Sequence, residues 1–86
     1  MIAMYYVYLL ECEDKSIYTG ITTDVGRRLR EHKTGKGASY TRSHGAKKIL
    51  RTERFRTRGT ALRREAFIKT LTRTQKLVLA SKPLGK

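Results

Sequence analysis

The chain has 86 residues, one cysteine and a formal net charge of +13, so it has the length of one domain and cannot form an intramolecular disulfide. No Cys/His cluster has zinc-site spacing, the first ten residues lack the basic start and cleavage site of a signal peptide, and no apolar run approaches the ~20 residues that span a bilayer. We therefore expect one soluble, cytoplasmic domain over residues 1–86, with its core at about 3–80 and no membrane partner.

Two strands open the chain. The aromatic and β-branched run Tyr5–Leu10 predicts a buried strand, and Ser16–Ile21 predicts a second. A three-residue loop centred on Asp14 would join them in an antiparallel hairpin that sets Tyr8 opposite Gly20. Because side chains alternate along a strand, one face of this hairpin would carry three tyrosines, namely Tyr6, Tyr8 and Tyr18.

A helix of about ten residues is predicted next, between the N-cap candidates of Thr22–Asp24 and a glycine stop at Gly35. Two polar residues fall on the stripe that should face inward, at positions i, i+3, i+4 and i+7. The four residues of this stripe are Val25, Arg28, Leu29 and His32.

The rest of the chain alternates loop, strand and helix. Lys36–Lys48 predicts a loop with room for one short helical turn, and Ile49–Phe55 predicts a third strand at the edge of the sheet. Thr60 is the expected cap of a helix from Ala61 to about Thr72, and Thr74–Ala80 predicts a last helix. The order β-β-α-β-α-α is typical of an α+β fold in which helices pack on a small sheet.

Twenty Lys and Arg residues stand against seven Asp and Glu residues, and they are spread along the whole chain after Gly20. This excess is larger than the net charge of about 2–8 that solubility needs, and it attracts polyanions in a salt-dependent way. An anionic membrane would favour a cationic amphipathic helix with an apolar face instead. We therefore expect nucleic acid as the partner, with DNA favoured over RNA.

The expected contacts with nucleic acid are basic side chains that would hold phosphates, together with one aromatic ring. These residues are Arg27, Lys36, Tyr40, Arg42, Lys47, Lys48, Arg51 and Arg54, with Arg56 and Arg58 as further phosphate contacts. Tyr40 could stack on a base, or it could be a surface tyrosine without such a role.

Several polar side chains fall on faces that should be buried. Glu65 lies at the border of the inward face of its helix, where a carboxylate costs several kcal/mol unless it is paired, protonated or bound to a cation. Its simpler explanation is a surface pair with Lys69 at i+4. Arg28 could reach solvent past Leu29, and His32 could be a core histidine. It is nevertheless unfavourable to bury two phenols, a guanidinium, an imidazole and a carboxylate on one face. Their occurrence together therefore indicates a functional site.

Four motifs follow one another in a recognisable order. Tyr6-Val7-Tyr8 is followed, ten residues after Tyr8, by Tyr18-Thr19-Gly20. Gly20–His32 continues the pattern, and Ala61–Lys69 completes it. This arrangement, over residues 3 to 80, resembles the GIY-YIG nuclease family, whose glutamate helix the last segment matches, and within it the small stand-alone UPF0213 branch.

The resemblance implies a three-stranded antiparallel sheet flanked by helices and a metal-dependent endonuclease that hydrolyses phosphodiester bonds. It implies one Mg²⁺ or Mn²⁺ ion with Glu65 as its ligand. Because the chain carries no zinc finger or helix-turn-helix, we expect it to select the structure of the nucleic acid rather than its sequence, as DNA repair enzymes do. The implied catalytic residues are Tyr8, Tyr18, Arg28, His32 and Glu65.

Phosphodiester hydrolysis gives each of these residues a role. Arg28 would bind the non-bridging oxygens, because its planar donors fit them better than an ammonium does. Tyr8 would be the base, with its pKa lowered by Arg28 and the metal. Tyr18 would position water or phosphate, and His32 would relay the proton.

Two other functions are compatible with the sequence. Many relatives carry an asparagine after the glutamate helix, and this chain contains none, which favours a non-catalytic nucleic-acid-binding module. A small basic chain also suits a docking subunit of a repair or ribosomal assembly. The edge strand and thin core allow either a monomer or a weak homodimer.

Overall fold

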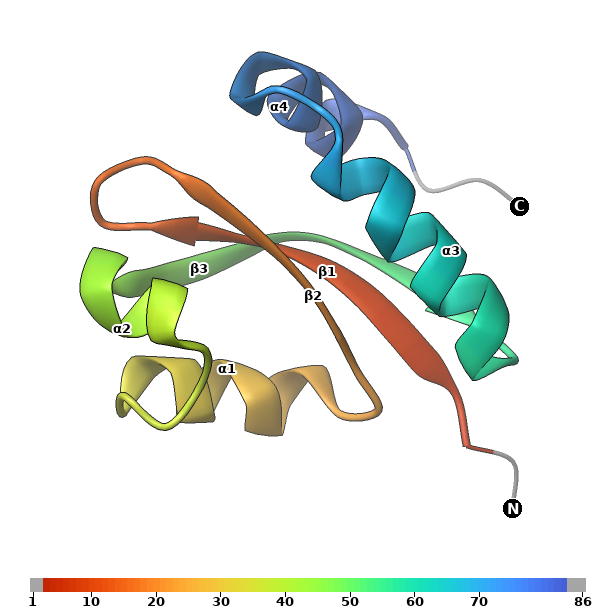
Figure 1. The fold of residues 1–86 in the computed structure, drawn as a ribbon, viewed down its shortest axis with the longest axis horizontal. Coiled ribbons are helices and arrows are strands. Elements are labelled where there is room, and N and C mark those ends of the chain that lie inside the picture. Colours follow the sequence, from red (N-terminus) through yellow and green to blue (C-terminus); the bar gives the residue numbers. More distant parts are fainter. Residues whose placement is uncertain (1–2, 84–86) are drawn as a thin grey trace.

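The computed structural model describes residues 3–83, in which a three-stranded antiparallel sheet carries helices on both faces (Figure 1). The elements in chain order are β1 (Tyr5–Cys12), β2 (Ile17–Thr22), α1 (Val25–Lys33), α2 (Ser39–His44), β3 (Ala46–Phe55), α3 (Arg58–Lys69) and α4 (Arg73–Ser81). The strand order is β2-β1-β3, so β1 is the central strand and β3 is an edge, as predicted. Helices α1 and α2 lie on one side of the sheet, and α3 and α4 lie on the other. The α+β class is confirmed.

The first hairpin has the predicted register. Tyr8 pairs with Gly20, and Leu10 pairs with Tyr18. The Cys12 N–H donates to the Ser16 carbonyl at 2.9 Å, which closes a three-residue loop. One face of β1 and β2 therefore carries Tyr6, Tyr8 and Tyr18, and the other face carries the side chains that pack in the apolar cluster.

The apolar core lies on the α3 side of the sheet. Val7 and Leu9 of β1 and Ile17 of β2 pack there against Ala61 and Ile68 of α3. Burial of each large apolar side chain contributes about 1.5–3 kcal/mol relative to exposure. Because this cluster holds the fold together, the opposite face of β1 is free to carry polar side chains.

Helix α1 begins and ends where the sequence predicts. Asp24 caps it by accepting the Arg27 N–H at 3.0 Å, and Gly35 follows its end with a φ of 81°. The segment 36–48, predicted as a loop with room for one short helical turn, contains the six-residue helix α2. The element order is therefore β-β-α-α-β-α-α.

Several other boundaries also differ from the prediction, because β1 extends two residues further, to Cys12, and α3 ends at Lys69, three residues before Thr72. Strand β3 already begins at Ala46, and α3 begins at Arg58. Thr57 rather than Thr60 caps α3, because the Thr57 hydroxyl accepts the N–H of Thr60 at 3.2 Å. Gly59 lies in the first turn of the helix. Helix α4 lies within one residue of its predicted bounds. In residues 3–83, none of the helices has the length and apolar character needed to cross a bilayer.

Candidate active site

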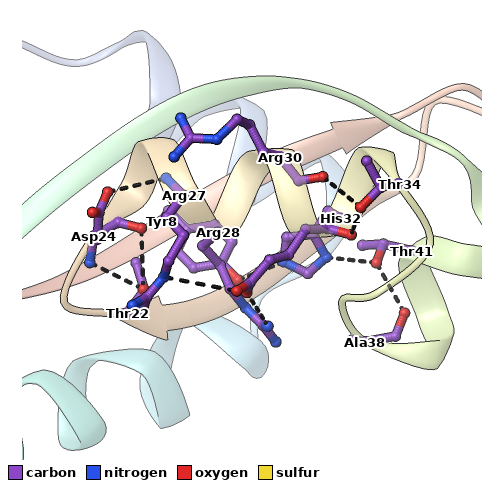
Figure 2. A network of polar contacts seen from close by, with 11 residues as sticks. Tyr8, Thr22, Asp24, Arg27, Arg28, Arg30, His32, Thr34, Ala38 and Thr41 are labelled. Atoms are coloured by element: carbon purple, nitrogen blue, oxygen red, sulfur yellow. Dashed lines mark hydrogen bonds and ion pairs between the residues drawn. The ribbon is translucent and has the colours of Figure 1, made fainter.

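Three buried side chains form a hydrogen-bonded chain on the α1 side of the sheet (Figure 2). The Tyr8 hydroxyl lies 2.7 Å from Nε2 of His32, and His32 Nδ1 lies 2.6 Å from Oγ1 of Thr41. The Thr41 hydroxyl donates in turn to the carbonyl oxygen of Ala38 at 2.9 Å. The exposed fractions of Tyr8, His32 and Thr41 are 1%, 2% and 1%. The chain thus joins β1, α1 and α2 through the interior.

Two glycines make room for these rings. A Cβ on Gly20 would lie 2.5 Å from Cζ of Tyr8 and 2.9 Å from Cε2 of Tyr18. A Cβ on Gly37 would lie 2.8 Å from Cγ of His32. All three distances are far below van der Waals contact, so only glycine fits at these positions. The glycine after Tyr18-Thr19 is therefore required by packing of the site.

Tyr18 extends the site toward the surface. Its ring centroid lies 6.2 Å from that of Tyr8 and 5.3 Å from that of His32. On its other side lies Tyr40, at 5.8 Å, which stacks on His44 at 4.0 Å with an interplanar angle of 5°. Tyr40 is 38% exposed, so this row of aromatic rings runs from the buried site to solvent.

Arg28 lies beside the buried chain (Figure 2). Its Nη1 donates to Oε1 of Glu31 at 2.9 Å, and its side chain is 29% exposed. Burial raises the pKa of Tyr8 to about 12, although the Arg28 guanidinium acts in the opposite direction. The expected lowering of the Tyr8 pKa by Arg28 is therefore outweighed by desolvation. Burial, followed by the positive charge of Arg28, lowers the pKa of His32, so the imidazole is neutral at pH 7.

Glu65 lies on α3, within electrostatic reach of the site. Its negative charge is one of the causes that raise the pKa of Tyr8. Its side chain is 14% exposed, and Oε2 lies 3.4 Å from Nζ of Lys69, so the i+4 pair exists. One carboxylate of this kind fits Mg²⁺, which binds through one or two carboxylates, substrate phosphates and retained waters. Within residues 3–83, no cluster of three or more His, Cys, Asp or Glu side chains could hold a metal.

Arg51 differs from the other expected phosphate contacts. Its side chain is 9% exposed, and Nε lies 2.7 Å from Oε2 of Glu53. Its Nη1 donates to the carbonyl oxygens of Leu79 and Lys82 at 3.0 and 2.9 Å. Arg64 of α3 donates to the other oxygen of Glu53 at 2.7 Å. We therefore assign Arg51 to the fold, where it connects β3 to the end of α4.

The other expected contacts have exposed side chains, and Arg27 shares Glu31 with Arg28 at a distance of 3.7 Å. These exposed residues are Arg27, Lys36, Tyr40, Arg42, Lys47, Lys48, Arg54, Arg56 and Arg58.

Sequence reasoning missed Thr41 and Glu53. Thr41 lies in a polar segment without periodicity, and nothing in the sequence distinguishes it from its neighbours. Glu53 had a detectable signal, because Arg51, Glu53 and Phe55 are spaced two residues apart and so share one face of a predicted strand. Opposite charges two residues apart on the inward face of a strand indicate an ion pair within the fold.

Comparison with known proteins shows the family to which the chain belongs. The sequence profile of the GIY-YIG catalytic domain matches residues 4–77, which include the five candidate catalytic residues. A UPF0213 protein of Haloquadratum walsbyi is 53% identical over 76 residues, which cover 88% of this chain and 85% of that protein. A UPF0213 protein of Natronomonas pharaonis is 45% identical over 85 residues, which cover 99% of this chain and all of that protein.

A solved structure extends the agreement to the fold. The solution NMR structure of a UPF0213 protein from Bacillus halodurans is similar to this chain with a TM-score of 0.58 at 47% identity. The match covers 91% of this chain and 83% of that one. The chain therefore belongs to the UPF0213 family and has the GIY-YIG catalytic domain.

Proposed function

We propose that this protein is a divalent-metal-dependent endonuclease that hydrolyses phosphodiester bonds in nucleic acid. The observation that carries the proposal is the buried chain from Tyr8 through His32 to Thr41, with Arg28 beside it. A phenol and a neutral imidazole within 2.7 Å can move a proton, and a guanidinium can hold the phosphate on which that proton transfer acts.

The buried chain supplies a route for the proton of the attacking water. As the water oxygen bonds to phosphorus, its proton passes to the Tyr8 oxygen, and the Tyr8 proton passes to Nε2 of His32. The bond from phosphorus to the leaving oxygen breaks, and that alkoxide takes a proton from solvent. The products are a phosphate monoester and an alcohol, and the imidazolium then returns its proton to the Tyr8 oxygen while Tyr8 passes a proton to solvent. Because both proton transfers occur together, Tyr8 with its pKa of about 12 need not be a phenolate beforehand.

Arg28 and Glu65 have complementary tasks. Glu31 occupies one donor of the Arg28 guanidinium, which has five, so others can bind the non-bridging oxygens of the phosphate. Glu65 would hold one Mg²⁺ or Mn²⁺ ion, which neutralises charge on the leaving oxygen when bound. Tyr18, in contact with both Tyr8 and His32, would position water or phosphate.

The substrate proposal rests on the exposed cations. They would bind backbone phosphates rather than read bases, which suits a substrate selected by its structure. DNA is our first candidate, in the form of a flap, a nick or a single strand. The exposed Tyr40–His44 stack lies where an unpaired base could join it.

A substrate panel with a matched pair of variants tests this function. Labelled duplex, flap, single-stranded DNA and RNA are incubated with Mg²⁺ and with EDTA. We expect cleavage of at least one substrate in Mg²⁺, none in EDTA, and a loss of about 10²-fold or more in Glu65→Gln. Glu13→Gln, the same change at an exposed turn residue, should cleave normally.

Two results would contradict the proposal. Full activity in EDTA or in Glu65→Gln would remove the metal from the reaction. Binding that persists in EDTA, with no product in either Mg²⁺ or Mn²⁺, would favour a non-catalytic nucleic-acid-binding module instead.

A further inference from the structure

Thr41 is the last side chain of the buried chain, and its hydrogen bonds determine where the protons lie. A threonine hydroxyl has one proton to donate and lone pairs that accept. The Ala38 carbonyl oxygen can only accept, so the bond of 2.9 Å between them uses the Thr41 proton. Thr41 Oγ1 therefore meets His32 Nδ1, at 2.6 Å, as an acceptor.

An accepting oxygen at this position selects one tautomer of His32. The proton must be on Nδ1, and in a neutral imidazole Nε2 then presents a lone pair. Tyr8, at 2.7 Å, consequently donates its hydroxyl proton to Nε2. All the protons of the chain thus point in one direction, from Tyr8 through His32 and Thr41 to Ala38.

The surroundings of the ring prevent it from turning over. The backbone of Gly37 packs directly against the imidazole, and the centroid of the Tyr18 ring lies 5.3 Å from that of the imidazole. His32 is 2% exposed, so water cannot replace a lost partner. A turned ring would place carbon atoms opposite Tyr8 and Thr41 and leave buried polar groups unpaired, which is unfavourable.

We propose that Thr41 is a positioning residue that holds His32 in the Nδ1-protonated tautomer, so that Nε2 is ready to take the proton of Tyr8. Without the Thr41 hydroxyl, the tautomer with its proton on Nε2 becomes accessible. In that tautomer both His32 and Tyr8 present a proton to one another, and His32 cannot act as the acceptor. The catalytic consequence rests on the nuclease function proposed above, whereas the tautomer itself does not.

Nuclear magnetic resonance of ¹⁵N-histidine-labelled protein at pH 7 measures the tautomer directly. The chain has two histidines, which makes the assignment simple. In the wild type we expect His32 with a protonated Nδ1 and an unprotonated Nε2. Thr41→Val should move the population toward protonated Nε2, and Thr41→Ser should restore the wild-type pattern.

Two controls separate this effect from damage to the fold. His44 lies on the same short helix as Thr41, with Nδ1 2.8 Å from the Tyr40 carbonyl oxygen, so an unchanged His44 signal shows that α2 is intact. Thr34→Val makes the same chemical change at an exposed hydroxyl that bonds only backbone carbonyls, and it should leave His32 unaffected. If Thr41→Val does not fold, the His32 tautomer measured in the wild type and in Thr41→Ser still tests the proposal.

Cleavage assays complete the test. Thr41→Val should lose about 10- to 100-fold in cleavage rate, less than the whole contribution of general base catalysis, and Thr41→Ser should retain most of it. A wild-type His32 protonated on Nε2 would overturn the inference, and so would a changed tautomer with unchanged cleavage. The expected tautomers without cleavage by any variant, wild type included, would support the Thr41 assignment and contradict the nuclease function.

Discussion

The packing of the site requires a residue without a side chain at Gly20. Gly20 pairs with Tyr8 across the hairpin, and the Tyr8 ring lies over it on the way to His32. The space that a Cβ would need is occupied by Tyr8 and Tyr18. Gly26, in contrast, lies on the exposed side of α1, where a Cβ would meet its nearest neighbours at 3.7 Å.

The two glycines should therefore respond in opposite directions to the same substitution. Gly20→Ala should lower the free energy of unfolding by about 1–3 kcal/mol, because the added methyl overpacks the site. Gly26→Ala should raise it by about 0.5–1 kcal/mol, because alanine is the better helix former. Urea unfolding of both variants measures the difference. A Gly20→Ala protein as stable as the wild type would show that the tyrosines can move aside.

At the scale of the element, β3 serves both sides of the sheet. Arg51 pairs with Leu9 and Arg54 with Tyr6, so these two arginines point to opposite faces. On the α3 side, Glu53 holds both Arg51 and Arg64 within 2.7 Å. On the tyrosine side, Arg54 is exposed. Strand β3 thus binds the helices α3 and α4 through Arg51 and Glu53 on one face of the sheet, and it carries the exposed cation Arg54 on the other face.

The arginine pair gives a test of this division. Arg51→Ala should lower the free energy of unfolding by about 1.5–3 kcal/mol, since it removes charged hydrogen bonds to Glu53 and to α4. Arg54→Ala should change it by no more than about 0.5 kcal/mol but should weaken DNA binding. Thermal unfolding and fluorescence anisotropy measure the two effects. Loss of stability in Arg54→Ala with none in Arg51→Ala would reverse the assignment.

For the whole molecule, the acidic residues leave most of the positive charge free. Glu31, Glu53 and Glu65 each pair with basic side chains, and only seven acids stand against 20 Lys and Arg residues. Exposed cations occur on α1, on α2 and on β3. The molecule therefore carries a positive surface on several elements, with no single basic segment responsible for it.

Salt titration tests the proposed binding of DNA by this surface. The logarithm of the affinity should fall linearly with the logarithm of the salt concentration, with a slope of about −0.9 for each phosphate neutralised. Lys47→Ala, which removes an exposed cation, should reduce the magnitude of this slope by about one. A folded Arg51→Ala protein should keep the wild-type slope. A slope near zero in the wild type would contradict nucleic acid as the partner.

Part of this organisation could be predicted because it depends on local rules. Alternation along two strands and a short loop were sufficient for the Tyr8–Gly20 register, and so for the shared face of Tyr8 and Tyr18. Helical periodicity placed Arg28 and His32 on the inward side of α1. These four side chains do meet in the structure.

The features of the fold and the site that could not be predicted from the sequence depend on contacts between distant segments. Helix α2 has six residues, too few for a periodic pattern, so the burial of Thr41 had no signal in the sequence. The pKa of Tyr8 depends on the balance between desolvation and the charge of Arg28, and sequence spacing shows the charge but not the depth of burial. Thr60 was predicted to cap α3, and the true cap, Thr57, is determined by the course of the chain after β3.

The position of β1 between the apolar cluster and the site limits which changes in its sequence the protein can tolerate. Val7 and Leu9 face the apolar cluster, while Tyr8 between them faces His32. A point substitution therefore alters either the stability of the fold or the chemistry of the site. Insertion or deletion of one residue between Tyr8 and Leu9 would instead turn Tyr8 toward the apolar cluster and Val7 toward the site, and so disrupt both at once. A substitution at one of these buried positions should accordingly impair one of the two properties, whereas a change of length within the strand should impair both.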